Sequence, residues 1–124
     1  MQRTASILLP FLVLAVGATA HAAPSVAAKG RVVRIVFIGK KQACDCTRKA
    51  IESGRKALQA ALGNKSRSRL LELAIDVDRE KVDALRKKRA FTGLPAIYFF
   101  DAAGEVKELL QGDITEAQIR AVFE

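Results

Sequence analysis

The apolar and polar positions between residues 31 and 124 follow two periods, one typical of strands and one typical of helices. Continuous runs of β-branched and aromatic residues predict buried strands, and alternation of apolar with polar residues predicts strands that have one exposed face. These patterns predict strands over residues 32–38, 70–77, 96–100 and 105–110. Because the turn residues 101–104 connect the last two strands, we expect these strands to form a hairpin.

Apolar residues three and four positions apart predict helices in the intervals between and after the strands. The first helix spans residues 47–62 and ends at Gly63. The second helix begins after Asp78, whose carboxylate we expect to cap the helix N-terminus. The last helix begins after Thr115, which forms a capping-box pattern with Gln118.

The resulting order is strand, helix, strand, helix, strand, strand, helix. A strand-helix-strand unit of this length predicts a parallel pair with a right-handed crossover, and the later hairpin adds antiparallel strands to the same sheet. We therefore expect one α/β domain, with a central four-stranded mixed sheet and helices on both faces. A chain of 124 residues is long enough for one such core and too short for two domains of ordinary size.

The first 22 residues have the pattern of a signal peptide. Arg3 provides a positive start, residues 7–17 form an apolar run, and small residues favour cleavage after Ala22. The run is shorter than the roughly 20 apolar residues of a membrane-spanning helix, so we expect no stable membrane span. The predicted organisation is a signal peptide over 1–22, a flexible segment over 23–30 and a folded domain over 31–124, in a periplasmic or secreted protein.

The chain is basic, with 21 Lys and Arg residues against 13 Asp and Glu residues and a formal net charge of +8. The basic residues are scattered, and the aromatic residues do not alternate with them as base-stacking side chains would. We therefore interpret the charge as a solvated surface and expect no nucleic-acid partner. The single histidine, His21, lies in the predicted signal peptide, so the mature chain is expected to lack imidazole for catalysis or metal binding.

Two cysteines, Cys44 and Cys46, lie between the first predicted strand and the first predicted helix. Residues two apart in a regular helix point roughly 200° from each other, so a disulfide between these cysteines requires Cys44 to lie in the preceding turn. The Cα separation that a disulfide needs, about 4.4–6.8 Å, can be reached there, although the small ring should be strained. Because strain makes a disulfide easier to reduce, we expect an oxidising couple.

The element order, the two cysteines and the Leu94-Pro95 dipeptide before the third strand resemble the thioredoxin superfamily over residues 31–124. The most specific similarity lies in residues 92–100 and 104–106, which look like the family's cis-proline loop and closing hairpin. The resemblance implies a thioredoxin-like fold and a cis peptide bond at Pro95, opposite the cysteines. It also implies that the backbone of Leu94 pairs with an extended substrate segment.

The sequence departs from the family pattern in two places. One residue separates the cysteines where the family has two, and the Trp, Gly and Pro that are common around the family's pair are absent. The acidic residue that thioredoxins bury on the first strand is also missing, because Ile38 or Lys40 occupies its approximate position. These departures leave the route of proton transfer open.

We expect Cys44 to be the attacking thiolate and Cys46 to resolve the mixed disulfide. Asp45 opposes a Cys44 anion, whereas the helix N-terminus favours it together with four nearby cations, which are Lys40, Lys41, Arg48 and Lys49. In the alternative assignment, Cys46 aligns with the family nucleophile and Cys44 is the accessory thiol.

Three functions are compatible with the cysteine pair. In the first, which we favour, Cys44 and Cys46 exchange disulfides with protein thiols or disulfides without a cofactor, in a monomeric protein for which a membrane reductase is a candidate partner. In the second, the two thiolates bind a soft ion such as Cu(I), Hg(II) or an arsenical. In the third, the cysteines form a structural bridge in a binding module without catalysis, although so small a loop stabilises little.

Overall fold

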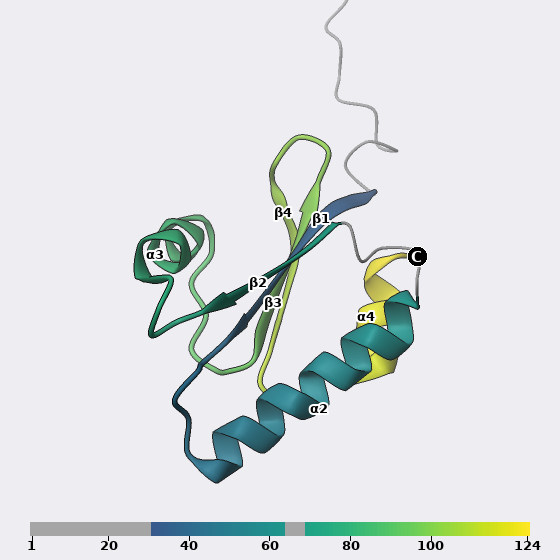
Figure 1. Ribbon diagram of the computed structural model, residues 1–124. Coiled ribbons are helices and arrows are strands. Elements are labelled where there is room, and N and C mark those ends of the chain that lie inside the picture. Colours follow the sequence, from purple (N-terminus) through teal and green to yellow (C-terminus); the bar gives the residue numbers. More distant parts are fainter. Residues whose placement is uncertain (1–30, 64–68) are drawn as a thin grey trace, which may run out of the picture.

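The computed structural model describes residues 31–63 and 69–124, and Figure 1 shows how their elements are arranged. The predicted signal peptide (1–22) and the segment 23–30 lie outside the described residues. None of the helices formed by the described residues is long and apolar enough to cross a membrane. The predicted element order is confirmed, with β1 (Val32–Gly39), α2 (Asp45–Leu62), β2 (Leu70–Ala74), α3 (Arg79–Lys88), β3 (Ala96–Asp101), β4 (Val106–Gln111) and α4 (Glu116–Val122).

The strands form one mixed sheet in the order β2-β1-β3-β4. β1 pairs parallel with β2 and antiparallel with β3, and β3 pairs antiparallel with β4. Helix α3 lies on one side of the sheet, whereas α2 and α4 lie together on the other side (Figure 1). The predicted α/β fold with a four-stranded mixed sheet and helices on both faces is therefore confirmed.

The chain builds one hydrophobic core on each face of the sheet. Alternate side chains of β1 enter the two cores, so that Ile35 and Phe37 face α2 and α4, while Val36 and Ile38 face α3. β3 is buried along its whole length beside β1. Because burial of each large apolar side chain contributes roughly 1.5–3 kcal/mol, these two strands form a stable base for the loops at their ends.

The second strand is shorter than its alternating pattern predicts. β2 ends at Ala74, and residues 75–77 form a turn. The backbone turns here because the carbonyl of Ala74 accepts hydrogen bonds from the N–H groups of Val77 (3.1 Å) and Asp78 (2.7 Å). The prediction that the strand extends to Val77 is therefore wrong, and the side chain of this residue is 58% exposed.

Of the two predicted helix caps, one is confirmed and the other is wrong. Asp78 occupies the N-cap position of α3, but its side chain forms no hydrogen bond to the helix, contrary to our expectation. Its carboxylate instead accepts a hydrogen bond from the N–H of Ala74 at 2.9 Å, which closes the turn after β2. The predicted capping box of α4 is confirmed, since Thr115 and Gln118 exchange hydrogen bonds of 3.0 and 3.2 Å.

Candidate functional site

Cys44 and Cys46 lie at the N-terminus of α2, the long helix that follows the inner strand β1 (Figure 1). Cys44 is the N-cap residue, with the extended backbone angles φ −62° and ψ 162°, and Cys46 belongs to the first turn of the helix. Both residues are free thiols, and both are exposed. The helix begins two residues earlier than predicted, yet Cys44 still lies just outside it, which is the arrangement that a Cys44–Cys46 bridge requires.

The thiol of Cys44 has a hydroxyl partner within the first turn of α2. Its Sγ lies 3.2 Å from Oγ1 of Thr47. This hydrogen bond is the main cause that lowers the pKa of Cys44, and backbone hydrogen bonds from Thr47 and Cys46 lower it further. The unpaired N–H groups and the positive dipole end of the helix lie at the same place. Cys44 is therefore an exposed thiol whose anion is stabilised, which is what an attacking thiolate requires.

Thr47 is not among the residues predicted for the site, although its spacing from Cys44 in the sequence indicates a contact between the two side chains. It lies three residues after Cys44, the spacing at which an N-cap side chain meets the first turn of a helix. A cysteine pair with two intervening residues would have its second cysteine at this position. If Cys44 aligns with the first cysteine of such a pair, Thr47 presents a hydroxyl at the position of the second sulfur, and Cys46 is displaced from it by about 100° around the helix.

Replacement of Thr47 by valine is expected to raise the pKa of Cys44, because valine keeps the branched shape and removes the hydroxyl. The reaction of Cys44 with a small disulfide should become severalfold slower at neutral pH. Well above the pKa, where both proteins carry the thiolate, the variant should react at least as fast as wild type, because the more basic thiolate is the better nucleophile. A pH titration of thiolate absorbance in a Cys46→Ser background measures the shift. Thr47→Ser is the matched control, and an unchanged pKa in Thr47→Val would show that the hydroxyl does not stabilise the anion.

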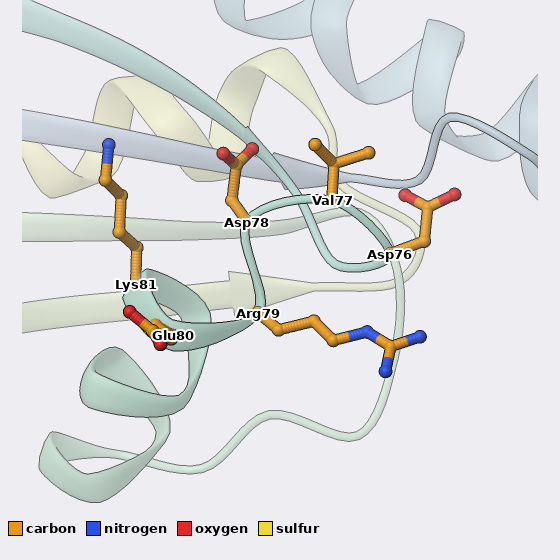
Figure 2. Close-up of a pocket in the computed structure, with 6 residues that line it drawn as sticks. All are labelled: Asp76, Val77, Asp78, Arg79, Glu80 and Lys81. Carbon is orange, nitrogen blue, oxygen red and sulfur yellow. The ribbon is translucent and has the colours of Figure 1, made fainter.

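The loop that carries Cys44 is anchored by a carboxylate from the turn that follows the neighbouring strand β2. Asp76, in the turn after β2, accepts hydrogen bonds from the backbone N–H groups of Lys41 and Gln42, each at 3.0 Å. These two bonds hold the pKa of Asp76 below its ordinary value. Asp76 also lines an open hollow of about 480 Å³. Figure 2 shows its carboxylate directed away from α3. The carboxylate therefore positions the cysteine loop.

Pro95 supports the same helix, but farther along its length. The Leu94–Pro95 peptide bond is cis, and the proline ring is buried. A Cβ atom added to Gly54 of α2 would lie 2.6 Å from Cγ of Pro95, so the ring packs directly against the glycine. Gly54 follows Cys44 by ten residues, about 15 Å along the helix axis. The ring thus contacts the middle of α2, whereas the cysteines lie at its N-terminal end. The structure therefore does not place Pro95 opposite the cysteines, as the resemblance implies.

The loop before Pro95 presents unpaired backbone groups. Among residues 31–63 and 69–124, none forms a hydrogen bond with the N–H or the C=O of Leu94. The preceding residues are held by Gln111 of β4, whose Oε1 accepts hydrogen bonds from the N–H groups of Thr92 (2.7 Å) and Gly93 (3.0 Å). Gln111 was not predicted for the site, because nothing in the local sequence connects it with a loop about 20 residues earlier. It holds the loop so that the backbone of Leu94 remains open.

Neither residue at the approximate position of the family's buried acid is acidic. Ile38 is fully buried and Lys40 is exposed, so neither supplies the buried acid of the family pattern. Within the described part of the chain, no group of three or more His, Cys, Asp and Glu residues is arranged to hold a metal ion.

Comparison of the sequence with protein-family models and with curated proteins gives no match. Among solved structures, chloroplastic thioredoxin z is similar, with 19% sequence identity and a TM-score of 0.50 over 79% of this chain and 80% of that chain. The thioredoxin of Malassezia sympodialis, Mala s 13, matches with 11% identity and a TM-score of 0.50 over 78% of this chain and 80% of that chain. Together with the strand order and the position of the cysteines, these similarities show that the protein has a thioredoxin-like fold.

Proposed function

We propose that this protein is an exported thiol-disulfide oxidoreductase that exchanges disulfides with protein partners through Cys44 and Cys46. One observation carries the proposal. The thiol of Cys44 is exposed at the N-cap of a long helix, with the hydroxyl of Thr47 at 3.2 Å and a lowered pKa. An inert structural cysteine would be buried in apolar surroundings, where its pKa is raised.

In the reducing direction, the Cys44 thiolate attacks one sulfur of a substrate disulfide. A bond forms between Sγ of Cys44 and that sulfur, the substrate S–S bond breaks, and the other substrate sulfur leaves as a thiolate that takes a proton from solvent. The Cys46 thiolate then attacks Sγ of Cys44 and releases the first substrate sulfur. The substrate gains two electrons and the cysteine pair loses two, and the reverse steps transfer a disulfide to a reduced partner.

The backbone of Leu94 supports recognition of an extended substrate segment. Its N–H and C=O are free of partners among the described residues, and the loop that carries it is held in place by Gln111. Buried backbone groups need hydrogen-bond partners, so a segment that covers this loop is stabilised when it pairs with Leu94. Leu94 and Pro95 are the substrate-binding residues in this proposal.

The protein functions outside the cytoplasm in this proposal, either in the periplasm or after secretion. The signal-peptide pattern of residues 1–22 supports this location, and a thiol pair that cycles through a disulfide suits an oxidising compartment. Protein thiols and disulfides are its partners, and a membrane reductase is the candidate that regenerates the pair. No cofactor is required, because the reaction moves electrons only between sulfur atoms.

A trapping experiment tests this function. The Cys46→Ser variant is expected to accumulate a mixed disulfide between Cys44 and an oxidised substrate such as insulin or scrambled ribonuclease, because the thiol that would release the substrate is missing. Mass spectrometry after acid quenching detects the adduct and assigns its position. Wild type should show little adduct and a reduced substrate. If Cys46→Ser forms no adduct with any disulfide, Cys44 does not exchange disulfides and the proposal fails.

A further inference from the structure

A second candidate site is a groove on the face of the sheet that α3 covers. The groove encloses about 290 Å³ between α3 and the strands β1 and β2. Its floor includes the side chains of Val36, Leu73 and Leu85, which belong to the buried core of this face. Leu71 also lines the groove, and it is 45% exposed. This volume is close to the lower end of the range for small-molecule sites, which are mostly apolar and have a few placed polar groups.

The register of the sheet places the apolar residues and a cation at different sides of this groove. Side chains two residues apart on a strand share a face of the sheet, and so do those of paired residues on neighbouring strands. Val36 pairs with Leu71 of β2, and Arg34 pairs with Phe100 of β3. The guanidinium carbon of Arg34 lies 4.3 Å from the centroid of the Phe100 ring, so this side chain extends toward β3. The groove thus crosses the sheet from an apolar side at β2 to a cation beside β3.

Lys88 of α3 brings a second positive charge to the same ring. Its Nζ lies 5.8 Å from the ring centroid of Phe100 and donates a hydrogen bond to the carbonyl of Gly104 at 3.1 Å. In the part of the chain that the structure describes, neither Arg34 nor Lys88 forms an ion pair, and no acidic residue lines the groove. Because two like charges lie near one buried ring, an anionic group that reaches both is stabilised there.

A third cation, Lys81, lines the groove at a distance from this pair. It precedes Lys88 on α3 by about two turns, roughly 10 Å along the helix axis, with Leu85 between them. The three cations are therefore not equivalent. Arg34 and Lys88 can contact the same small anionic group, whereas Lys81 contributes only to the positive potential of the groove.

From this arrangement we infer that the groove binds a small amphiphilic carboxylate, a fatty acid of medium chain length. Its carboxylate contacts Arg34 and Lys88, and its chain lies across Val36 and covers Leu71. A guanidinium can bind both oxygens of a carboxylate, and the Phe100 ring already holds this guanidinium in place. The chain must cross two strand spacings, roughly 10 Å, to reach β2. A single molecule of this kind compensates the charge at one side of the groove and buries the apolar surface at the other.

An NMR titration of the full chain with octanoate tests this site. Nuclear Overhauser effects should connect the terminal methyl group of octanoate with Leu71, and its first methylene group with Arg34. Acetate lacks the apolar chain and octyltrimethylammonium reverses the charge, so each should bind at least about tenfold more weakly than octanoate. Binding of either control as tight as that of octanoate, or contacts of octanoate with other residues only, would overturn the inference.

Two matched pairs of variants separate this site from a general surface effect. Arg34→Gln is expected to weaken octanoate binding by about tenfold, whereas Lys81→Gln removes the same charge from the same groove and should weaken it by no more than about twofold. Leu71→Gln should weaken it by about fivefold, and Val33→Gln, at a residue that is 37% exposed and outside the groove, should leave it unchanged. All four side chains are exposed, so the variants should keep the fold, which their amide spectra report. Equal losses in Arg34→Gln and Lys81→Gln would indicate a diffuse cationic surface and contradict the inference.

Discussion

The Cys44→Ser variant is expected to lose thiol-disulfide exchange, with the rate of insulin reduction falling by at least about 100-fold, because a hydroxyl cannot replace the attacking thiolate. The proposed role of Cys44 is supported by the position of its sulfur at the helix N-cap, 3.2 Å from the hydroxyl of Thr47, and by its lowered pKa. The variant should fold normally, since Cys44 is exposed and contributes no side chain to either core. A turbidity assay of insulin reduction, with dithiothreitol as the source of electrons, measures the loss.

The matched control for this prediction is Cys46→Ser. It should also lose turnover, but it should retain a stoichiometric first step, because Cys44 can still attack a disulfide once. The two variants therefore separate attack from resolution. If Cys44→Ser keeps the first step and Cys46→Ser loses it, the roles of the two cysteines are reversed. If both variants keep full turnover, the cysteines are not the reactive groups.

The element order and the sheet were predictable from the sequence because the core is built from local patterns. β1 and β3 are buried, so their apolar runs are nearly continuous, and the apolar stripes of the helices match the faces that pack on them. The end of β2 was not predictable in the same way. The alternation of apolar residues continues to Val77, but hydrogen bonds of Ala74 with Val77 and Asp78 turn the backbone three residues earlier. A local pattern cannot show where such a turn competes with the sheet.

Only the part of the site that belongs to short sequence motifs could be predicted. The two cysteines and the proline dipeptide are visible in the sequence, and so is the requirement that Cys44 lie outside the helix. The groups that hold the site come from distant segments. Asp76 bonds to a loop 34 and 35 residues earlier, and Gln111 bonds to a loop 18 and 19 residues earlier. These contacts depend on which loops the sheet brings together, and neither side chain belongs to a recognisable motif.

Gly54 shows the same limitation within a helix. A glycine in the interior of α2 costs about 1 kcal/mol relative to alanine, and the apolar stripe alone explains only that a small residue is tolerated there. The structure supplies the reason, since the ring of Pro95 occupies the space of a Cβ atom. The glycine thus allows α2 to pack closely on the loop that carries Leu94 and Pro95. Helix α2 follows the cysteines and this loop carries the proposed substrate-binding residues, so the proposed site depends on their relative position.

Replacement of Gly54 by alanine is therefore expected to destabilise the protein, although alanine is the better helix former. The added methyl group would lie 2.6 Å from Cγ of a buried proline ring, so either the helix or the loop must shift. Overpacking of this kind costs about 1–3 kcal/mol, and the conformational gain of about 1 kcal/mol offsets only part of it. We expect a net loss of up to about 2 kcal/mol, measured as a lower midpoint of thermal or urea unfolding.

Ser53→Ala is the matched control, because it makes a similar change one residue away, at an exposed position of the same helix. It should be neutral or stabilising by about 0.5 kcal/mol, since alanine is the better helix former and no atom of the loop is displaced. If Gly54→Ala proves as stable as Ser53→Ala, the contact between α2 and Pro95 is looser than the structure shows. If it is destabilised and also slows exchange by Cys44, whose thiol lies about 15 Å along the helix axis, then the packing of α2 on the proline loop sets the geometry in which a substrate reaches the sulfur.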